Sequence, residues 1–198
     1  VGVTPVGFRA PGYNVDARVL EALERHGFAY DSSLLPSPAY FALRAAHIAM
    51  QRAKRAPSSS IVGDVRHFAT ASRAYRPRRG ALHRRARSRV DGYDVLEIPI
   101  ASCAGVPFFG TGVTLAPSSS SALLAAAALR CASPCVLELH AIDFVDAHDG
   151  FDVALVRARR DLRVSARTKI GRIESTLRVM AQASDVRTLA KIAADSAP

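Results

Sequence analysis

Residues 6–31 of the chain have the sequence VGFRAPGYNVDARVLEALERHGFAYD, and this stretch decides the fold class. Residues 6–9 are short, mostly apolar and flanked by Pro5 and Pro11, which is typical of the end of a buried strand. Residues 28–30 predict a second strand. With a helix between them, the two strands have the spacing of a βαβ unit, and such a unit predicts a parallel sheet.

The helix between these strands has signals at both of its ends. Asn14 or Asp16 can cap the first turn, and Gly27 is a natural stop after His26. The apolar positions recur at helical spacing, and they are Val15, Val19 and Leu23.

Strands and helices continue to alternate along the rest of the chain. Further strands are predicted over residues 95–100 and 136–140. Further helices are predicted over residues 39–52, from after Pro117 to about Arg130, over residues 164–180 and over residues 186–194. The helix over residues 164–180 has an apolar face formed by Ile170, Ile173, Leu177 and Met180. The alternation predicts an α/β fold with mostly parallel strands covered by helices.

Length and composition indicate one globular domain over residues 1–198. The chain has 198 residues, which suits one domain at about 150 residues each. Hydrophobic residues make up 49%, so the chain can bury a core, and disorder, collagen and a disulfide scaffold are excluded for the chain as a whole. The longest apolar stretch, residues 122–129, is too short to cross a bilayer.

The positive charge is concentrated in one segment. Residues 52–89 contain twelve basic residues and one acid, whereas the rest of the chain is close to neutral. Residues 56–90 show little periodicity apart from a short strand expected at 60–62, so they predict a basic loop or insertion. The eight arginines of residues 73–89 can also contact nucleic acid or an anionic membrane surface. Nucleic acid is not favoured, because Tyr75 is the only aromatic residue there.

Arg9 is the first candidate site residue. It follows an expected strand, and Pro11 restricts the backbone before it. Parallel α/β folds build active sites at the carboxyl ends of their strands. A fixed guanidinium there can hold a carboxylate in one orientation and favour its charged form. The alternative is a structural arginine that pins a loop.

The second candidate is the segment from Glu138 to Asp149. Glu138 and His140 share one face of the expected strand, because residues two apart on a strand point the same way. Asp143 can hydrogen-bond His140, and a nearby carboxylate favours the proton-donating form of an imidazole, which suits a general acid. Metal ligation by His140, Asp143 and His148 is a second interpretation. A hydrogen-bonded acidic surface loop is a third.

Together these segments resemble a known family. Residues 7–13 (GFRAPGY), a capped helix and residues 27–33 (GFAYDSS) are similar to the polysaccharide deacetylase (NodB homology) family around its R-x-P motif. Residues 137–140 (LELH) resemble its late histidine motif, and residues 96–100 resemble the strand after its variable middle region. The resemblance extends over residues 6–194.

The resemblance implies a distorted, here partial, (β/α) barrel with a metal-dependent hydrolase site at the strand carboxyl ends. A divalent metal, usually zinc, would activate water for attack on an N-acyl group of a carbohydrate or lipid-linked amino sugar. Carried over by position, Arg9 would orient the catalytic base and His140 would protonate the leaving amine. Pro11 and Tyr13 would shape the substrate groove, and proximity suggests that Asp143 or Glu138 orients His140.

The family's metal-binding motifs are not found in this sequence. The early Thr-Phe-Asp-Asp type segment is absent before Arg9, no H-x-x-x-H occurs, and the chain has no Trp. We therefore expect the carboxyl-terminal part of a bacterial-type deacetylase domain, without its amino-terminal half, that is inactive and binds no metal when alone. A non-catalytic scaffold is the competing interpretation. The chain starts at Val1 without a signal peptide, so we expect it to begin inside a longer protein, with a cytoplasmic location as the default.

Overall fold

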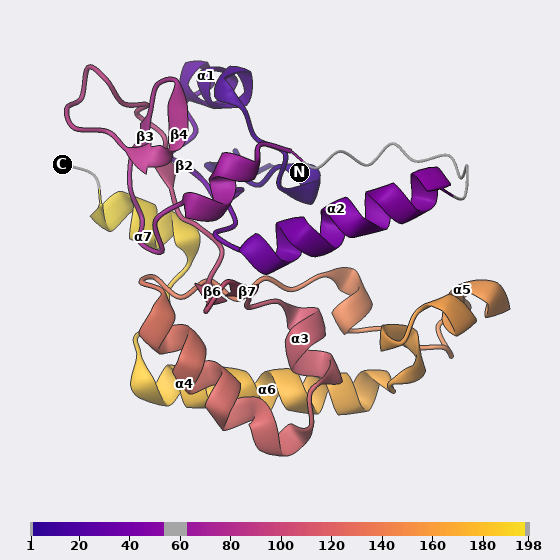
Figure 1. Cartoon of the computed structure of the whole chain (residues 1–198). Helices are drawn as coiled ribbons and strands as arrows, with labels where there is room; N and C mark the ends of the chain where they lie inside the picture. Colours follow the sequence, from indigo (N-terminus) through magenta and orange to yellow (C-terminus); the bar gives the residue numbers. More distant parts are fainter. Residues whose placement is uncertain (1, 54–62, 197–198) are drawn as a thin grey trace. The chain divides into compact units, whose positions relative to one another are not determined.

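The computed structural model describes residues 2–53 and 63–196 of the chain (Figure 1). They form a mixed α/β structure, as predicted, which divides into two compact units. Unit 1 consists of Val1–Pro107, Ala132–Val136 and Arg187–Pro198, and unit 2 consists of Phe108–Cys131 and Leu137–Val186.

Unit 1 is built on a small parallel sheet. Its strands are β1 (Gly7–Phe8), β2 (Tyr30–Asp31) and β5 (Leu96–Glu97), in the order β1-β2-β5. Both neighbouring pairs are parallel, which confirms the βαβ unit predicted from the sequence. A Cβ atom at Gly7 would lie 1.9 Å from the Tyr30 ring, so the absence of a side chain at Gly7 lets the ring cover the strand.

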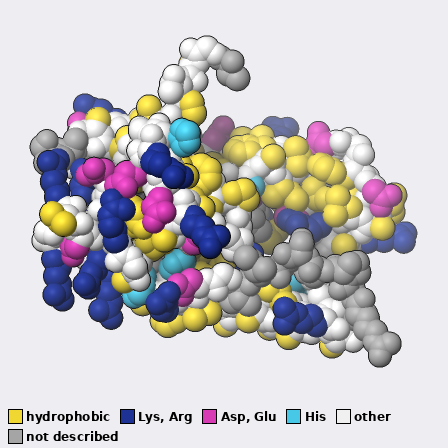
Figure 2. Space-filling view, turned by 90° about the horizontal axis from the view of Figure 1, so that it is seen from above, with side chains coloured by type: hydrophobic (Ala, Val, Ile, Leu, Met, Phe, Trp, Pro, Cys, Tyr) yellow, Lys and Arg dark blue, Asp and Glu magenta, His cyan; other side chains and the backbone are white. Residues whose placement is uncertain are grey.

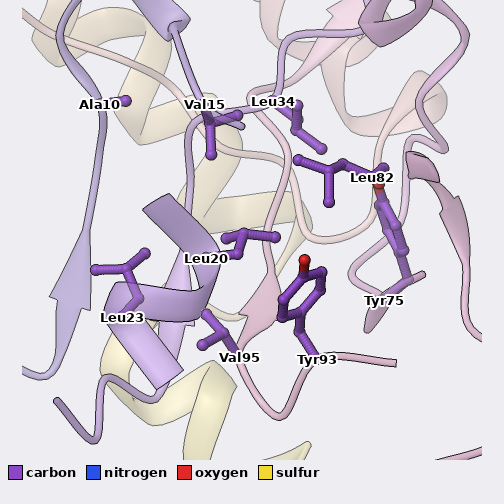
Figure 3. Close-up of a cluster of buried hydrophobic side chains, with 9 residues drawn as sticks. All are labelled: Ala10, Val15, Leu20, Leu23, Leu34, Tyr75, Leu82, Tyr93 and Val95. Carbon is purple, nitrogen blue, oxygen red and sulfur yellow. The ribbon is translucent and has the colours of Figure 1, made fainter. Parts of the chain in front are cut away.

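The crossover helix α1 (Ala17–Arg25) connects β1 to β2. Asp16 caps it by accepting a hydrogen bond from the Val19 N–H at 3.0 Å, so Asp16 rather than Asn14 is the cap. Gly27, with φ of +71°, ends the helix in the left-handed conformation that favours glycine. One side of the helix enters the core of unit 1, whose buried members are Ala10, Val15, Leu20, Leu23, Leu34, Tyr75, Leu82, Tyr93 and Val95 (Figure 3).

An antiparallel hairpin, β3 (Pro77–Arg78) and β4 (Ala81–Arg85), lies within the arginine-rich segment. The prediction of little regular structure was wrong for this part. Tyr75 and Leu82 are 3% and 8% exposed, and they anchor the hairpin to the core between exposed arginines. The strand expected at residues 60–62 lies outside the described residues.

The other elements of unit 1 follow the sequence closely. The helices α2 (Pro38–Ala53) and α7 (Leu189–Asp195) confirm two predicted helices. The strand predicted over residues 95–100 is shorter, because only Leu96–Glu97 pairs as β5. A second hairpin, β6 (Ser102–Cys103) and β7 (Val106–Pro107), follows it.

Unit 2 is mainly helical. It contains α3 (Gly110–Leu115), α4 (Ser121–Cys131), α5 (Val153–Ala158) and α6 (Ala166–Ala183), and α6 packs against both α3 and α4 (Figure 1). The helices α4 and α6 confirm predictions. The predicted apolar face of α6 was partly wrong, since Ile170 and Leu177 are 37% and 40% exposed. The buried face consists of Lys169, Ile173, Thr176 and Met180.

The strand predicted over residues 136–140 is not formed. In unit 2, Glu138 makes only an isolated parallel bridge with Phe109, and the chain then enters a 3₁₀ helix at Ala141–Asp143. In the described residues the sheets have three, two and two strands, and no barrel closes. The expectation of mostly parallel strands fails as well, because both hairpins are antiparallel. No helix in the described ranges has an apolar stretch long enough to span a bilayer.

Candidate functional site

Arg9 lies directly after β1, at the carboxyl edge of the parallel sheet. Its Nε donates to the Ser32 carbonyl at 2.8 Å, and its Nη2 donates to Ser32 Oγ at 2.7 Å. Ser32 Oγ in turn donates to the carbonyl of Ile98, after β5, at 2.7 Å. The guanidinium is therefore fixed by a chain of hydrogen bonds that joins the ends of all three strands. This geometry fits both interpretations of Arg9, a loop pin and an orienting group.

Two carboxyl groups, Asp31 and Glu97, are fully buried beside each other in this sheet. They are paired across β2 and β5, and each is 0% exposed. Asp31 Oδ1 accepts from Ser33 Oγ at 2.6 Å, and Glu97 Oε1 accepts from the Leu34 N–H at 3.0 Å. The remaining oxygens, Asp31 Oδ2 and Glu97 Oε2, are buried without a donor. One added proton would let these two oxygens hydrogen-bond each other.

Both carboxyl groups of this pair have raised pKa values, and the rise is larger at Glu97. Burial raises the pKa of Glu97 well above its ordinary range, and the Asp31 charge and the hydrogen bond to Asp31 raise it further. Burial also raises the pKa of Asp31, but hydrogen bonds from Ser33 and Glu97 and the charge of Arg9 oppose that rise. Two buried carboxyls that share a site titrate as a unit.

The sequence analysis did not identify this pair. Asp31 was noted only as part of a family-like block, and Glu97 only as part of a strand. The available signal was an acidic residue directly after one expected strand, Asp31, and another inside a second expected strand, Glu97, where an unpaired charge is costly. Their partnership depends on the register between β2 and β5, which places Asp31 opposite Glu97.

Pro11 and Tyr13 form a short 3₁₀ helix after Arg9. Pro11 is exposed, and Tyr13 packs edge-on against Tyr40 of α2 with ring centroids 5.2 Å apart. Tyr13 has φ of +61°, an uncommon conformation for a residue with a side chain. Arg44 of α2 donates to the Gly12 carbonyl at 2.6 Å and supports this strained turn. Pro11 and Tyr13 thus lie on one turn beside Arg9, as a groove wall requires.

His140 belongs to unit 2, where its side chain is 51% exposed. Its Nε2 lies 3.8 Å from Oε1 of Glu138, which is 4% exposed. The site therefore places a buried acidic group beside an imidazole that faces solvent. Such a pair can deliver a proton to a group that approaches from solvent.

The Asp143 carboxylate positions the backbone of His140 in a capping box at the start of the 3₁₀ helix. The carboxylate Oδ2 accepts from the His140 N–H at 2.8 Å, and Oδ1 accepts from Thr111 Oγ1 at 3.3 Å. Asp143 is 0% exposed, so it has no access to a substrate. Of the two acids expected to orient His140, Glu138 is the one near the imidazole. Asp143 acts as a positioning residue.

Gly110, the first residue of α3, makes room for Asp143. A Cβ atom there would lie 2.2 Å from Asp143 Oδ2 and 2.7 Å from Leu139 Cδ2. We expect Gly110→Ala to destabilise the protein by about 1–3 kcal/mol, because a buried carboxylate and a packed leucine must move. Gly112→Ala is the matched control on the same helix, since nothing lies within 4 Å of its Cβ position. Urea unfolding measures both variants, and equal effects would contradict the close approach at Gly110.

The residues that the structure describes do not fit a metal ion. Within residues 2–53 and 63–196, no three His, Cys, Asp or Glu side chains are grouped as ligands. His148 and Asp146 are connected through the His148 backbone N–H, which donates to Asp146 Oδ1 at 2.8 Å. The interpretation of His140, Asp143 and His148 as a ligand set is therefore wrong.

The candidate residues form two groups, which are Arg9, Pro11, Tyr13, Asp31 and Glu97 in unit 1 and Glu138, His140 and Asp143 in unit 2. No family model, no curated protein and no solved structure matches the chain. Its class follows from the fold and the site alone. It is a mixed α/β protein with an arginine and a proton-holding carboxyl pair at a parallel sheet, and with a carboxylate-backed histidine in a helical unit.

Proposed function

We propose that this chain is the carboxyl-terminal part of a metal-dependent N-deacetylase of the polysaccharide deacetylase type, which cleaves the amide bond of an N-acylated sugar. The observation that carries the proposal is the fixed position of Arg9 at the carboxyl edge of a parallel sheet. The same proposal includes a partial (β/α) barrel, in which β1, β2 and β5 form part of the wall. The proposed substrate is a carbohydrate or lipid-linked amino sugar.

In this proposal Arg9 is an orienting group. Its Nε and Nη2 are occupied by Ser32, so the guanidinium cannot rotate away. A rigid fork of this kind holds a carboxylate in one geometry. Burial raises the pKa of Asp31, and the charge of Arg9 is one of the influences that oppose this rise, so the guanidinium already interacts with a carboxyl group within this chain.

His140 is the proton donor of the proposed reaction. When the amide C–N bond breaks, the leaving nitrogen needs a proton, and the solvent-facing imidazolium supplies it. Glu138 lies beside the ring, with Oε1 3.8 Å from His140 Nε2, and the Asp143 carboxylate holds the His140 backbone in place. The described residues supply no metal site, so water activation and the catalytic base belong to the amino-terminal half that the proposal assigns to the whole enzyme.

Acetate release from an N-acetylated oligosaccharide tests the proposal. The longer protein that contains this chain should release acetate, and His140→Ala should lower its kcat by about 10²–10⁴-fold, the usual contribution of a general acid. His148→Ala is the matched control, because its described hydrogen bond comes from the backbone. The 198-residue chain with added zinc should show no turnover. Turnover by the chain alone that survives His140→Ala would refute the assignment.

A further inference from the structure

Five arginines of the basic segment have no acidic partner in the part of the chain that the structure describes. Three others are paired: Arg79 lies 2.8 Å from Glu24, Arg78 lies 3.6 Å from Asp91, and Arg76 lies 3.8 Å from Asp94. Arg79 also lies over the Tyr93 ring, 4.4 Å from its centroid. The unpaired ones are Arg73, Arg84, Arg85, Arg87 and Arg89. In Figure 2 the dark blue basic side chains gather on the side where Figure 1 places β3 and β4.

Three of these unpaired arginines converge on one cavity. Arg85, Arg87 and Arg89 line a pocket of about 370 Å³ in unit 1, together with Arg76 from the neighbouring strand region. Among the described residues, no acidic side chain lines it. The lining residues therefore carry a net positive charge, which an anion in the pocket can compensate.

The turn that carries these arginines is held from outside the pocket. The Asp91 carboxylate accepts from the backbone N–H groups of Arg87 and Ser88, at 3.0 and 2.7 Å. These hydrogen bonds lower the pKa of Asp91, although partial desolvation opposes them. Asp91 therefore stays charged and fixes the turn, while the Arg87 side chain remains available to the pocket.

We infer that this pocket binds the phosphate or diphosphate group of a small phosphorylated molecule. Guanidinium groups bind phosphate oxygens through paired, charge-assisted hydrogen bonds, and several of them suit a doubly charged group. Leu96 adds an apolar part to the lining, and the volume lies in the range of small-ligand pockets, so an organic group fits beside the phosphate. The inference does not depend on deacetylase activity, and the pocket lining includes none of the deacetylase candidates.

The geometry favours a small ligand over a nucleic acid. Single-stranded nucleic acids stack their bases on exposed aromatic rings. Tyr75, the one aromatic residue of the segment, is 3% exposed, and its hydroxyl donates to the Leu82 carbonyl at 2.7 Å. Although Tyr75 is among the residues that line the pocket, it is a core residue with almost no exposed surface on which a base could stack.

Calorimetric titration of the purified chain with inorganic pyrophosphate tests the inference. The double variant Arg85→Ala and Arg87→Ala should weaken binding roughly ten- to a hundredfold, because each arginine makes charged hydrogen bonds to the ligand. The control, Arg73→Ala and Arg84→Ala, removes the same charge from arginines that do not line the pocket, and Arg84 points away from Arg85 on β4. This control should change the affinity for pyrophosphate by less than about threefold, because salt screens the charge of surface arginines that do not contact the ligand.

Two further titrations identify the source of the phosphate. Binding to phosphatidylcholine vesicles only when they contain phosphatidylglycerol, with loss in the Arg85 and Arg87 double variant, would identify a lipid headgroup. Pyrophosphate binding without vesicle binding would identify a soluble phosphorylated molecule. Equal losses in both double variants, no binding of pyrophosphate, or tighter binding of single-stranded DNA than of pyrophosphate would overturn the inference.

Discussion

Replacing Lys169 with methionine is expected to lower the free energy of unfolding by about 3 kcal/mol or more, because each of three carbonyls would lose a hydrogen bond worth about 1 kcal/mol or more. The Lys169 side chain is fully buried in unit 2. Its ammonium donates to the Ile142 and Asp161 carbonyls, at 2.7 and 3.0 Å, and also to the Val145 carbonyl. Methionine fills a similar volume but has no donor, so three carbonyls lose a charged partner.

Hydrogen exchange and urea unfolding measure this effect. In Lys169→Met, the amides of residues 141–163 should exchange faster, because their segment is held to α6 by the three hydrogen bonds. Arg178→Met is the matched control, since it removes an exposed basic residue from the same helix and should change stability by less than about 0.5 kcal/mol. Equal stability of Lys169→Met and the wild type would show that the ammonium does not hold this segment.

Glu97→Gln is expected to make unit 1 more stable than the wild type at about pH 8, and to leave its stability at about pH 4 nearly unchanged. Glutamine resembles a protonated glutamate. Its amide N–H can donate to Asp31 Oδ2, which has no other donor, while its oxygen still accepts from the Leu34 N–H. The variant therefore keeps at every pH the hydrogen bond that the wild type has only when Glu97 is protonated.

The sign of this pH dependence of stability follows from the raised pKa of Glu97. Between its ordinary value of 4.5 and its higher folded-state value, folded protein holds a proton that unfolded protein releases. The stability from this proton is fully present below 4.5 and falls by about 1.4 kcal/mol per pH unit as the pH rises through this window. The raised pKa of Asp31 acts in the same direction. The variant should lack the Glu97 contribution to this slope.

Tyrosine fluorescence during urea unfolding at several pH values reports on unit 1, because all five tyrosines belong to it. Glu24→Gln is a control with the opposite sign. Burial alone would raise the pKa of Glu24, but the Asp94 N–H and Arg79 lower it overall. Loss of the Glu24 carboxylate in Glu24→Gln should therefore destabilise the protein at neutral pH and have little effect in acid. A wild-type slope that persists in Glu97→Gln would contradict the raised pKa of Glu97.

Local patterns were sufficient for the helices and for the first βαβ unit. The cap at Asp16, the stop at Gly27 and the helical spacing between them predicted α1 because these signals act within a few residues. The same holds for α2 and α4. Arg9 was predicted at the end of a strand and is found there, since strand position is also a local property.

The errors occurred where distant contacts decide the structure. Residues 136–140 have strand-like composition, but Glu138 finds only a single bridge partner, so no strand forms. The arginine-rich segment forms a hairpin because Tyr75 and Leu82 find a core to enter. Lys169 takes a position on the buried face of α6 because three distant carbonyls satisfy its charge.

The sequence by itself determined the mixed α/β class, the helix ends and the position of Arg9, because caps, helical spacing and strand ends depend on neighbouring residues. Only the tertiary structure decided that Asp31 lies opposite Glu97, that the Glu138 carboxylate lies beside the His140 ring, and that four arginines share a cavity. These facts depend on strand register and on the path of the chain between segments. Burial then strengthens the interactions between these groups, because a carboxyl or guanidinium removed from water responds strongly to its nearest charged neighbour.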